Sequence, residues 1–133
     1  MYDPAHLRLD EGVALITGAG AGIGRAIAET FASAGAAVVV TDRDATAANT
    51  VAEAINAAGG RSVGAACDVT READLEAAVA RAVDAFGKLT ILVNNAGGGG
   101  PKPFDMPMSD MRLAFELNVF SVFRLCQLAA PQM

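Results

Sequence analysis

The segment Thr17-Gly18-Ala19-Gly20-Ala21-Gly22-Ile23-Gly24 joins a short apolar run to an amphipathic stretch, and it decides the fold. Gly18 can adopt backbone angles that other residues avoid, so the chain can turn tightly there. Gly22 leaves bare main chain against which a diphosphate can rest, and Gly24 lets the next helix pack closely on the strand. The free N–H groups at the start of that helix favour phosphate. The segment therefore predicts a strand, a phosphate-binding turn and a helix.

Apolar runs and amphipathic stretches alternate along the chain. Four near-continuous apolar runs are typical of strands buried on both faces: Val13–Thr17, Ala36–Thr41, Ser62–Cys67 and Leu89–Val93. Three stretches with helical periodicity separate them, over residues 22–34, 44–58 and 70–86, each followed by glycine. Parallel strands need such crossovers, and the crossovers are right-handed. The pattern predicts a doubly wound α/β Rossmann fold with four parallel strands.

A glycine-rich loop follows the fourth apolar run, and a last helix is expected from about Ser109. That helix is apolar around nearly its whole circumference, which predicts that it is buried or lies in a subunit interface. The loop, residues 98–107, should lie on the ligand side of the sheet. Its apolar side chains suit either an apolar substrate such as a steroid or ordinary loop packing: Phe104, Met106 and Met108.

Composition excludes several classes of protein. The 133 residues fit one domain (residues 1–133), and 53% of them are apolar. The net charge of −5 is spread over interspersed acids and bases, so no basic surface for nucleic acid is expected. No apolar run is long enough to predict a membrane span, and residues 1–11 lack a leader-like apolar region. Cys67 and Cys126 have no metal-type spacing, which favours reduced thiols in a cytoplasmic protein.

Asp42 lies at the end of the second predicted strand, twenty residues beyond Gly22. A carboxylate there can accept both ribose hydroxyls of adenosine and would repel a 2′-phosphate, which favours NAD over NADP. Arg43 beside it could instead receive that phosphate. The strict G-x-G-x-x-G spacing is not met, so a flexible turn without a ligand is the alternative. Asp68 ends the third strand, where it could face adenine or cap the next helix.

Taken in order, these motifs resemble the short-chain dehydrogenase/reductase (SDR) family over essentially the whole chain. The matching residues are Thr17-Gly-x-x-x-Gly22-Ile-Gly24, Asp42, Asp68-Val69, Asn94-Asn95-Ala96-Gly97 and Asn118-Val119. Within the family, Gly97–Pro107 most resembles the bacterial NAD-dependent 7α-hydroxysteroid dehydrogenases.

The resemblance implies a role for each matching residue. The pyrophosphate site would be lined by Gly18, Gly22, Ile23 and Gly24, and the adenosine ribose would be bound by Asp42 with Arg43. The adenine would be flanked by Asp68 and Val69. The cofactor would be contacted beside the central strand by Asn94, Ala96 and Gly97. Asn118 would be the catalytic Asn that holds a water in a proton relay. From the residues alone, the Asn94-Asn95 pair could equally form a strand-end turn, and Asn118 could bond neighbouring backbone. No metal site is expected.

The family transfers hydride between a secondary alcohol, here a 7α-hydroxysteroid or bile acid, and nicotinamide. It uses a Ser and a Tyr with a Lys four positions later. The only Tyr here is Tyr2, and His6 stands four positions later. We therefore expect the truncated N-terminal half of an NAD-dependent enzyme, inactive by itself, or alternatively a non-catalytic dinucleotide-binding or regulatory module. The resemblance implies a homotetramer for the full-length enzyme. The open edge strand Leu89–Val93 or the last helix should make these residues self-associate.

Overall fold

The computed structural model describes residues 4–133 and contains one parallel sheet. Its strands are β1 (Val13–Ile16), β2 (Ala37–Asp42), β3 (Arg61–Ala66) and β4 (Ile91–Val93), in the order β3-β2-β1-β4. The helices are α1 (Gly22–Ser33), α2 (Ala45–Ala57), α3 (Glu72–Phe86), α4 (Met108–Phe115) and α5 (Ser121–Ala129). One 3-10 turn, Pro4–Leu7, precedes β1, and another, Ala130–Gln132, follows α5. The predicted doubly wound α/β fold is confirmed: a helix connects each strand to the next strand along the chain, and the four strands are parallel.

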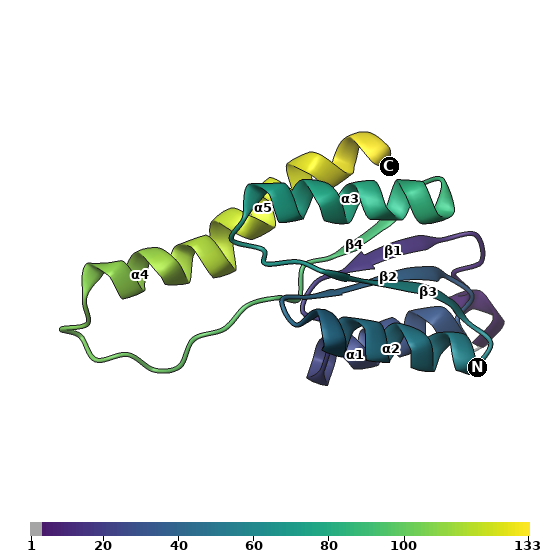
Figure 1. Cartoon of the computed structure of the whole chain (residues 1–133), viewed down its shortest axis with the longest axis horizontal. Coiled ribbons are helices and arrows are strands. Elements are labelled where there is room, and N and C mark those ends of the chain that lie inside the picture. Colours follow the sequence, from purple (N-terminus) through teal and green to yellow (C-terminus); the bar gives the residue numbers. More distant parts are fainter. Residues whose placement is uncertain (1–3) are drawn as a thin grey trace.

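The sheet is covered on both faces. Figure 1 shows α1 and α2 against one face and α3 with α5 against the other. Side chains alternate along β1: Val13 and Leu15 join the core under α3 and α5, while Ala14 and Ile16 join the core over α1 and α2. A strand buried on both faces cannot carry a polar side, which explains the near-continuous apolar runs.

Helix ends follow local side-chain chemistry. Asp44 caps α2 as expected, since its carboxylate accepts the Ala47 N–H at 3.1 Å. The start predicted near Thr70 for the third helix is two residues early. Asp68 Oδ1 accepts both the Thr70 N–H at 3.0 Å and its hydroxyl at 2.7 Å, which holds Thr70 in a turn ahead of Glu72.

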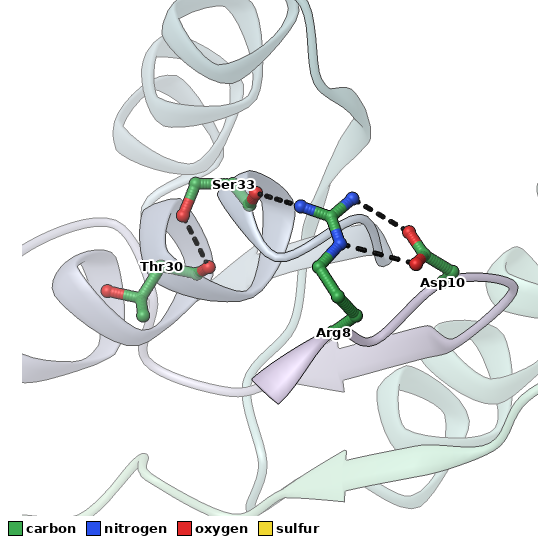
Figure 2. A network of polar contacts seen from close by, with 4 residues as sticks. All are labelled: Arg8, Asp10, Thr30 and Ser33. Atoms are coloured by element: carbon green, nitrogen blue, oxygen red, sulfur yellow. Dashed lines mark hydrogen bonds and ion pairs between the residues drawn. The ribbon is translucent and has the colours of Figure 1, made fainter. Parts of the chain in front are cut away.

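The segment before β1 is fastened to the end of α1. The Arg8 guanidinium donates to Asp10 Oδ1 at 2.8 Å and to the Ser33 carbonyl at 3.4 Å (Figure 2). The Ser33 hydroxyl in turn donates to the Thr30 carbonyl at 2.8 Å. The hydrogen bond between the two charged groups raises the pKa of Arg8 and lowers that of Asp10. This exposed pair positions the entry to β1 and adds little stability.

The last helical segment is not one regular helix. A π-helical turn, Glu116–Phe120, separates α4 from α5, and Figure 1 shows α4 extending beyond the end of the sheet. The prediction that this segment is buried holds for one stripe only: Ser121, Leu125 and Ala129 are buried against the α3 side of the core. Leu117 and Leu128 are half-buried against the same core, whereas Phe115, Val119, Phe120 and Phe123 are exposed.

By length and composition alone, Met108–Gln132 is also long and apolar enough to cross a membrane. The packing of this segment gives another account of its composition. Arg124 Nε donates to Glu72 of α3 at 2.7 Å, and Leu125 is fully buried in the core. A helix with one buried stripe and an ion pair to its neighbour packs as an element of the domain. This packing agrees with the expectation of no membrane span but does not test it, and the expectation stays a prediction.

Candidate functional site

The strands end together at one edge of the sheet, and the glycine turn lies there. Gly18 has a φ of +61° and Gly22 a φ of +57°, which side chains disfavour. A Cβ on Gly24 would collide with the Gly18 carbonyl oxygen and the Asn95 amide nitrogen. At Gly22 the place of a side chain is open, with no atom within 4 Å. The turn is therefore tight at Gly18, close-packed at Gly24 and bare at Gly22, as its sequence predicts.

Two residues outside the predicted site hold this turn in place. Thr17 is buried, and its hydroxyl oxygen accepts the N–H groups of Asn95 at 3.1 Å and Ala96 at 3.0 Å. The Asn95 amide donates to the carbonyls of Thr17 and Gly18, each at 3.0 Å. Both residues stand in the motifs quoted from the sequence but were given no role there: Thr17 directly precedes the glycines, and Asn95 is the second residue after β4.

The two adjacent asparagines face different neighbours. The Asn94 amide lies 3.4 Å from Cys126 Sγ on α5, and Asn94 does not line the cleft at the strand ends. Ala96 and Gly97, predicted with it, do line that cleft. Of the Asn94-Asn95 pair, Asn95 is thus the one that contacts the glycine turn.

Asp42 ends β2 beside the turn. Its Oδ2 accepts the Gly20 N–H and its Oδ1 accepts the Asp44 N–H, each at 3.0 Å. Each oxygen keeps a further lone pair, so the carboxylate can still accept hydroxyl groups. Arg43 is exposed and lines the same cleft.

The cleft across the strand ends has a volume of about 570 Å³, within the range of small-molecule sites. It is lined by Gly18, Asp42, Arg43, Cys67, Asp68, Val69, Thr70, Asn95, Ala96, Gly97, Gly98, Gly99, Leu113 and Leu117. Three predicted residues of the turn, Gly22, Ile23 and Gly24, lie outside this lining, and Ile23 is 75% exposed. Seven of the twelve predicted residues thus line the cleft, and Asn94 and Asn118 lie outside its lining together with these three residues of the turn.

Asp68 and Cys67 line the cleft with different charge states. The hydrogen bonds from Thr70 lower the pKa of Asp68, which keeps its carboxylate ionised. Burial, with the charges of Asp74 and Asp68, raises the pKa of the Cys67 thiol to about 11, which keeps it neutral. Val69 is buried beside them and offers an apolar contact.

Asn118 lies in the π-helical turn, a feature often found at functional sites. Its Oδ1 accepts the Gly98 N–H at 3.0 Å, and its amide donates to the Gly98 carbonyl at 3.0 Å. The same amide donates to the Ala114 carbonyl at 2.9 Å. The expected bond to neighbouring backbone is present, and the side chain also fixes the loop that borders the cleft.

A second cleft, of about 470 Å³, lies between the carboxyl-terminal ends of α1 and α2. Arg8 lines it, but the guanidinium of Arg8 is bonded to Asp10 and Ser33. This cleft is away from the carboxyl ends of the strands, where open α/β sheets bind ligands. Within residues 4–133, no group of three His, Cys, Asp or Glu side chains is placed to hold a metal ion.

A bare glycine turn, a carboxylate beside it and a cleft over the strand ends define the nucleotide-binding class of α/β domain. More narrowly, the chain belongs to the short-chain dehydrogenase family, whose model matches residues 12–133.

Individual relatives agree with this family. The chain is 59% identical to a 7α-hydroxysteroid dehydrogenase of Escherichia coli, covering all of this chain and 52% of that protein. It is 36% identical to a D-threitol dehydrogenase of Mycolicibacterium smegmatis, covering 95% of this chain and 49% of the relative. The chain therefore spans about half the length of these relatives.

Solved structures give the same result. A 7α-hydroxysteroid dehydrogenase complexed with NADH and 7-oxo glycochenodeoxycholic acid superposes with a TM-score of 0.96 at 59% identity, over 100% of this chain and 52% of that one. A short-chain dehydrogenase/reductase from Burkholderia xenovorans superposes with a TM-score of 0.87 at 40% identity, over 95% and 52% respectively.

Proposed function

We propose that this chain is the dinucleotide-binding half of an NAD-dependent oxidoreductase that transfers hydride between a secondary alcohol and nicotinamide. The observation that carries the proposal is the Asp42 carboxylate, fixed beside a glycine turn whose main chain is bare at Gly22. A non-catalytic dinucleotide-binding module is the second candidate. It predicts that the full-length protein binds the dinucleotide and turns over no alcohol.

Each residue of the site has a defined task in this proposal. The first N–H groups of α1, from Gly22 on, donate to the diphosphate, and the Asp42 carboxylate accepts the ribose hydroxyls of adenosine. Asp68 and Val69 flank the adenine. Bound NAD supplies the carbon that takes or gives the hydride. Asn118 holds Gly98, and with it the loop that borders the reacting end of the cleft.

We further propose a 7α-hydroxysteroid, such as a bile acid, as the substrate. The loop over residues 98–107 follows the cleft-lining Gly97, and Phe104 is fully exposed on it, free to contact an apolar ring system. The relative that is 59% identical over the whole chain is a 7α-hydroxysteroid dehydrogenase. The full-length protein should reduce NAD with a 7α-hydroxy bile acid and not with its 7β epimer. Equal rates with the two epimers would contradict this substrate.

Turnover requires groups that these residues do not supply. The only Tyr is Tyr2, which lies outside the described residues, and the position four residues later holds His6 where the family pattern has Lys. We propose that residues 1–133 bind the dinucleotide without turning over an alcohol. A cytoplasmic location and a homo-oligomer, a tetramer at full length, complete the proposal.

Calorimetric titration with NAD and with NADP tests the cofactor. We expect tighter binding of NAD, and Asp42→Ala should weaken it roughly tenfold or more, because hydrogen bonds to a charged group are lost. Asp84→Ala is the matched control, since it removes an exposed carboxylate on α3, far from the turn. Tighter binding of NADP by the unchanged protein, or equal effects of the two substitutions, would contradict the role of Asp42.

A further inference from the structure

Gly20 is a residue of the turn to which the family pattern, Thr-Gly-x-x-x-Gly-x-Gly, assigns nothing. Its backbone N–H nevertheless makes a defined hydrogen bond. The Ala19 N–H donates to the Thr41 carbonyl at 2.8 Å, and the next N–H, that of Gly20, donates to Asp42 Oδ2 at 3.0 Å. The pairing of β1 with β2 thus continues beyond the strands, and a side-chain carboxylate takes the place of the last main-chain acceptor.

The space that a side chain at position 20 would need is also occupied by neighbouring atoms. A Cβ there would lie 2.8 Å from Ala47 Cβ and 2.9 Å from Asp42 Oδ2, closer than side chains approach. Its φ is not among the positive values of this chain, so the backbone itself does not require glycine. The requirement comes from its two neighbours.

Both neighbours are themselves held by hydrogen bonds, so a Cβ at position 20 has to displace one of them. Ala47 lies in the first turn of α2, where its N–H donates to Asp44 Oδ1 at 3.1 Å. Asp44 in turn donates its own N–H to Asp42 Oδ1 at 3.0 Å. Asp42 is therefore held at both oxygens, by Gly20 on one side and by the start of α2 on the other.

We propose that Gly20 is a positioning residue for cofactor specificity. It holds Asp42 so that the carboxylate stays in the path of a 2′-phosphate and accepts a free 2′-hydroxyl instead. An Asp42 displaced from this position could turn aside and leave the phosphate to the adjacent, exposed Arg43. The inference rests on the proposed function, in which Asp42 binds the adenosine ribose.

The test measures dissociation constants of NAD and NADP for Gly20→Ala. We expect NAD to bind roughly tenfold more weakly and NADP not to weaken, so that the preference for NAD falls roughly tenfold. Gly22→Ala is the matched comparison. Its strain at positive φ, with open space around it, should weaken both dinucleotides by one common factor and leave the preference unchanged.

Two further variants separate this inference from the function on which it rests. If Asp42→Ala leaves the preference for NAD unchanged, the role of Asp42 in the ribose site fails. If Asp42→Ala lowers the preference and Gly20→Ala does not, the role of Gly20 alone is overturned. In the Asp42→Ala background, Gly20→Ala should change the preference no further, because the two act through one contact.

Circular dichroism and the thermal midpoint report whether each variant folds. Should Gly20→Ala not fold, the pair Gly20→Ala with Ala47→Gly takes its place. It removes the crowding against Ala47 and keeps the contact with Asp42. The same fall in preference is expected, and an unchanged preference in the pair overturns the proposal.

Discussion

The β1–α1–β2 segment and the helical segment Met108–Gln132 bury their apolar side chains to very different extents. Leu15 in β1 is fully buried, and all four residues of that strand are closed off on both faces. Phe123 in α5 is 65% exposed, and α4 has no buried residue. Both segments are rich in apolar residues, so composition does not separate them.

The difference concerns where each segment finds its partners. The glycine turn is held by β2 through Asp42 and by the end of β4 through Asn95, so its contacts all lie within the described chain. The last segment contributes one buried stripe and two half-buried leucines to the core, and it exposes several large apolar side chains. The glycine turn is thus held in place by these residues alone, whereas the apolar helix face needs a further surface to cover it.

Truncation of one large apolar side chain in each segment should give the largest contrast. Leu15→Ala should lower the free energy of unfolding by about 2–5 kcal/mol, because it leaves a cavity in a closed core. Phe123→Ala should change it by about 0.5 kcal/mol or less, since that ring is already in water. Urea unfolding followed by circular dichroism measures both. A large and protein-concentration-dependent loss in Phe123→Ala would mean that association buries this ring in solution.

The adjacent asparagines give a sharper comparison within one loop. Asn95→Ala should lower the free energy of unfolding by about 1–3 kcal/mol, because the carbonyls of the buried Thr17 and of Gly18 lose their donor. Asn94→Ala removes only a weak contact with Cys126 Sγ and should cost about 0.5 kcal/mol or less. The same urea titration serves, and equal losses would show that the brace on the turn is not Asn95.

These two asparagines also show what sequence reasoning reaches. The strand-turn-helix unit was predictable because glycine spacing and apolar runs act locally. For the same reason the four strands of the sheet could be located along the chain. Which asparagine of the pair faces the turn was not predictable. That depends on the side of the chain each takes after β4 ends, and this is set by Thr17, 78 positions away from Asn95.

The last helix could be predicted only in part, for a related reason. Its pattern predicts that it is buried or lies in a subunit interface, and a pattern does not state whether the covering partner lies in the same chain. The π-helical turn at Asn118 was also not predictable. Asn118 bonds there to the Gly98 backbone, 20 positions away, and a local pattern does not reveal such a contact. The role of Gly20 required knowing that Ala47 and Asp42 both lie beside it.

The two cysteines extend the comparison to pH, with a smaller effect on stability. Cys67 is buried, and its pKa in the folded chain is about 11, against an ordinary value of 9.0. In the unfolded chain the thiol ionises first, so folding loses stability as the pH rises from about 9 to about 11. We expect a loss of about 1–2 kcal/mol over this window, which Cys67→Ala should reduce.

The measurement is urea unfolding at pH 8 and at pH 10.5. Cys126→Ala is the matched control, because it removes the other thiol of the chain, which is exposed on α5. If the pH dependence is the same in the protein and in Cys67→Ala, the thiol is not what links stability to alkaline pH.

The smallest effect on unfolding, and the most direct test of the uncovered face, comes from the exposed rings of the last segment. Phe115→Ser with Phe123→Ser should change the free energy of unfolding little, since the two side chains are 47% and 65% exposed. It should instead abolish self-association, which we expect of the unchanged protein and which light scattering over a concentration series measures. Leu7→Ser, at an exposed apolar side chain on the opposite end of the chain, is the matched control and should still associate.

The outcomes separate two surfaces that could join copies of the chain. If the doubly substituted protein still associates, the two exposed rings do not form the contact. We then expect it at β4, one of the two edge strands of the sheet, whose unpaired main-chain groups can extend a sheet into another copy. If the unchanged protein is a monomer at high concentration, neither surface joins copies of this chain. The apolar face then has to be covered by something other than a second copy, and the contrast between the self-contained turn and the open helix becomes stronger.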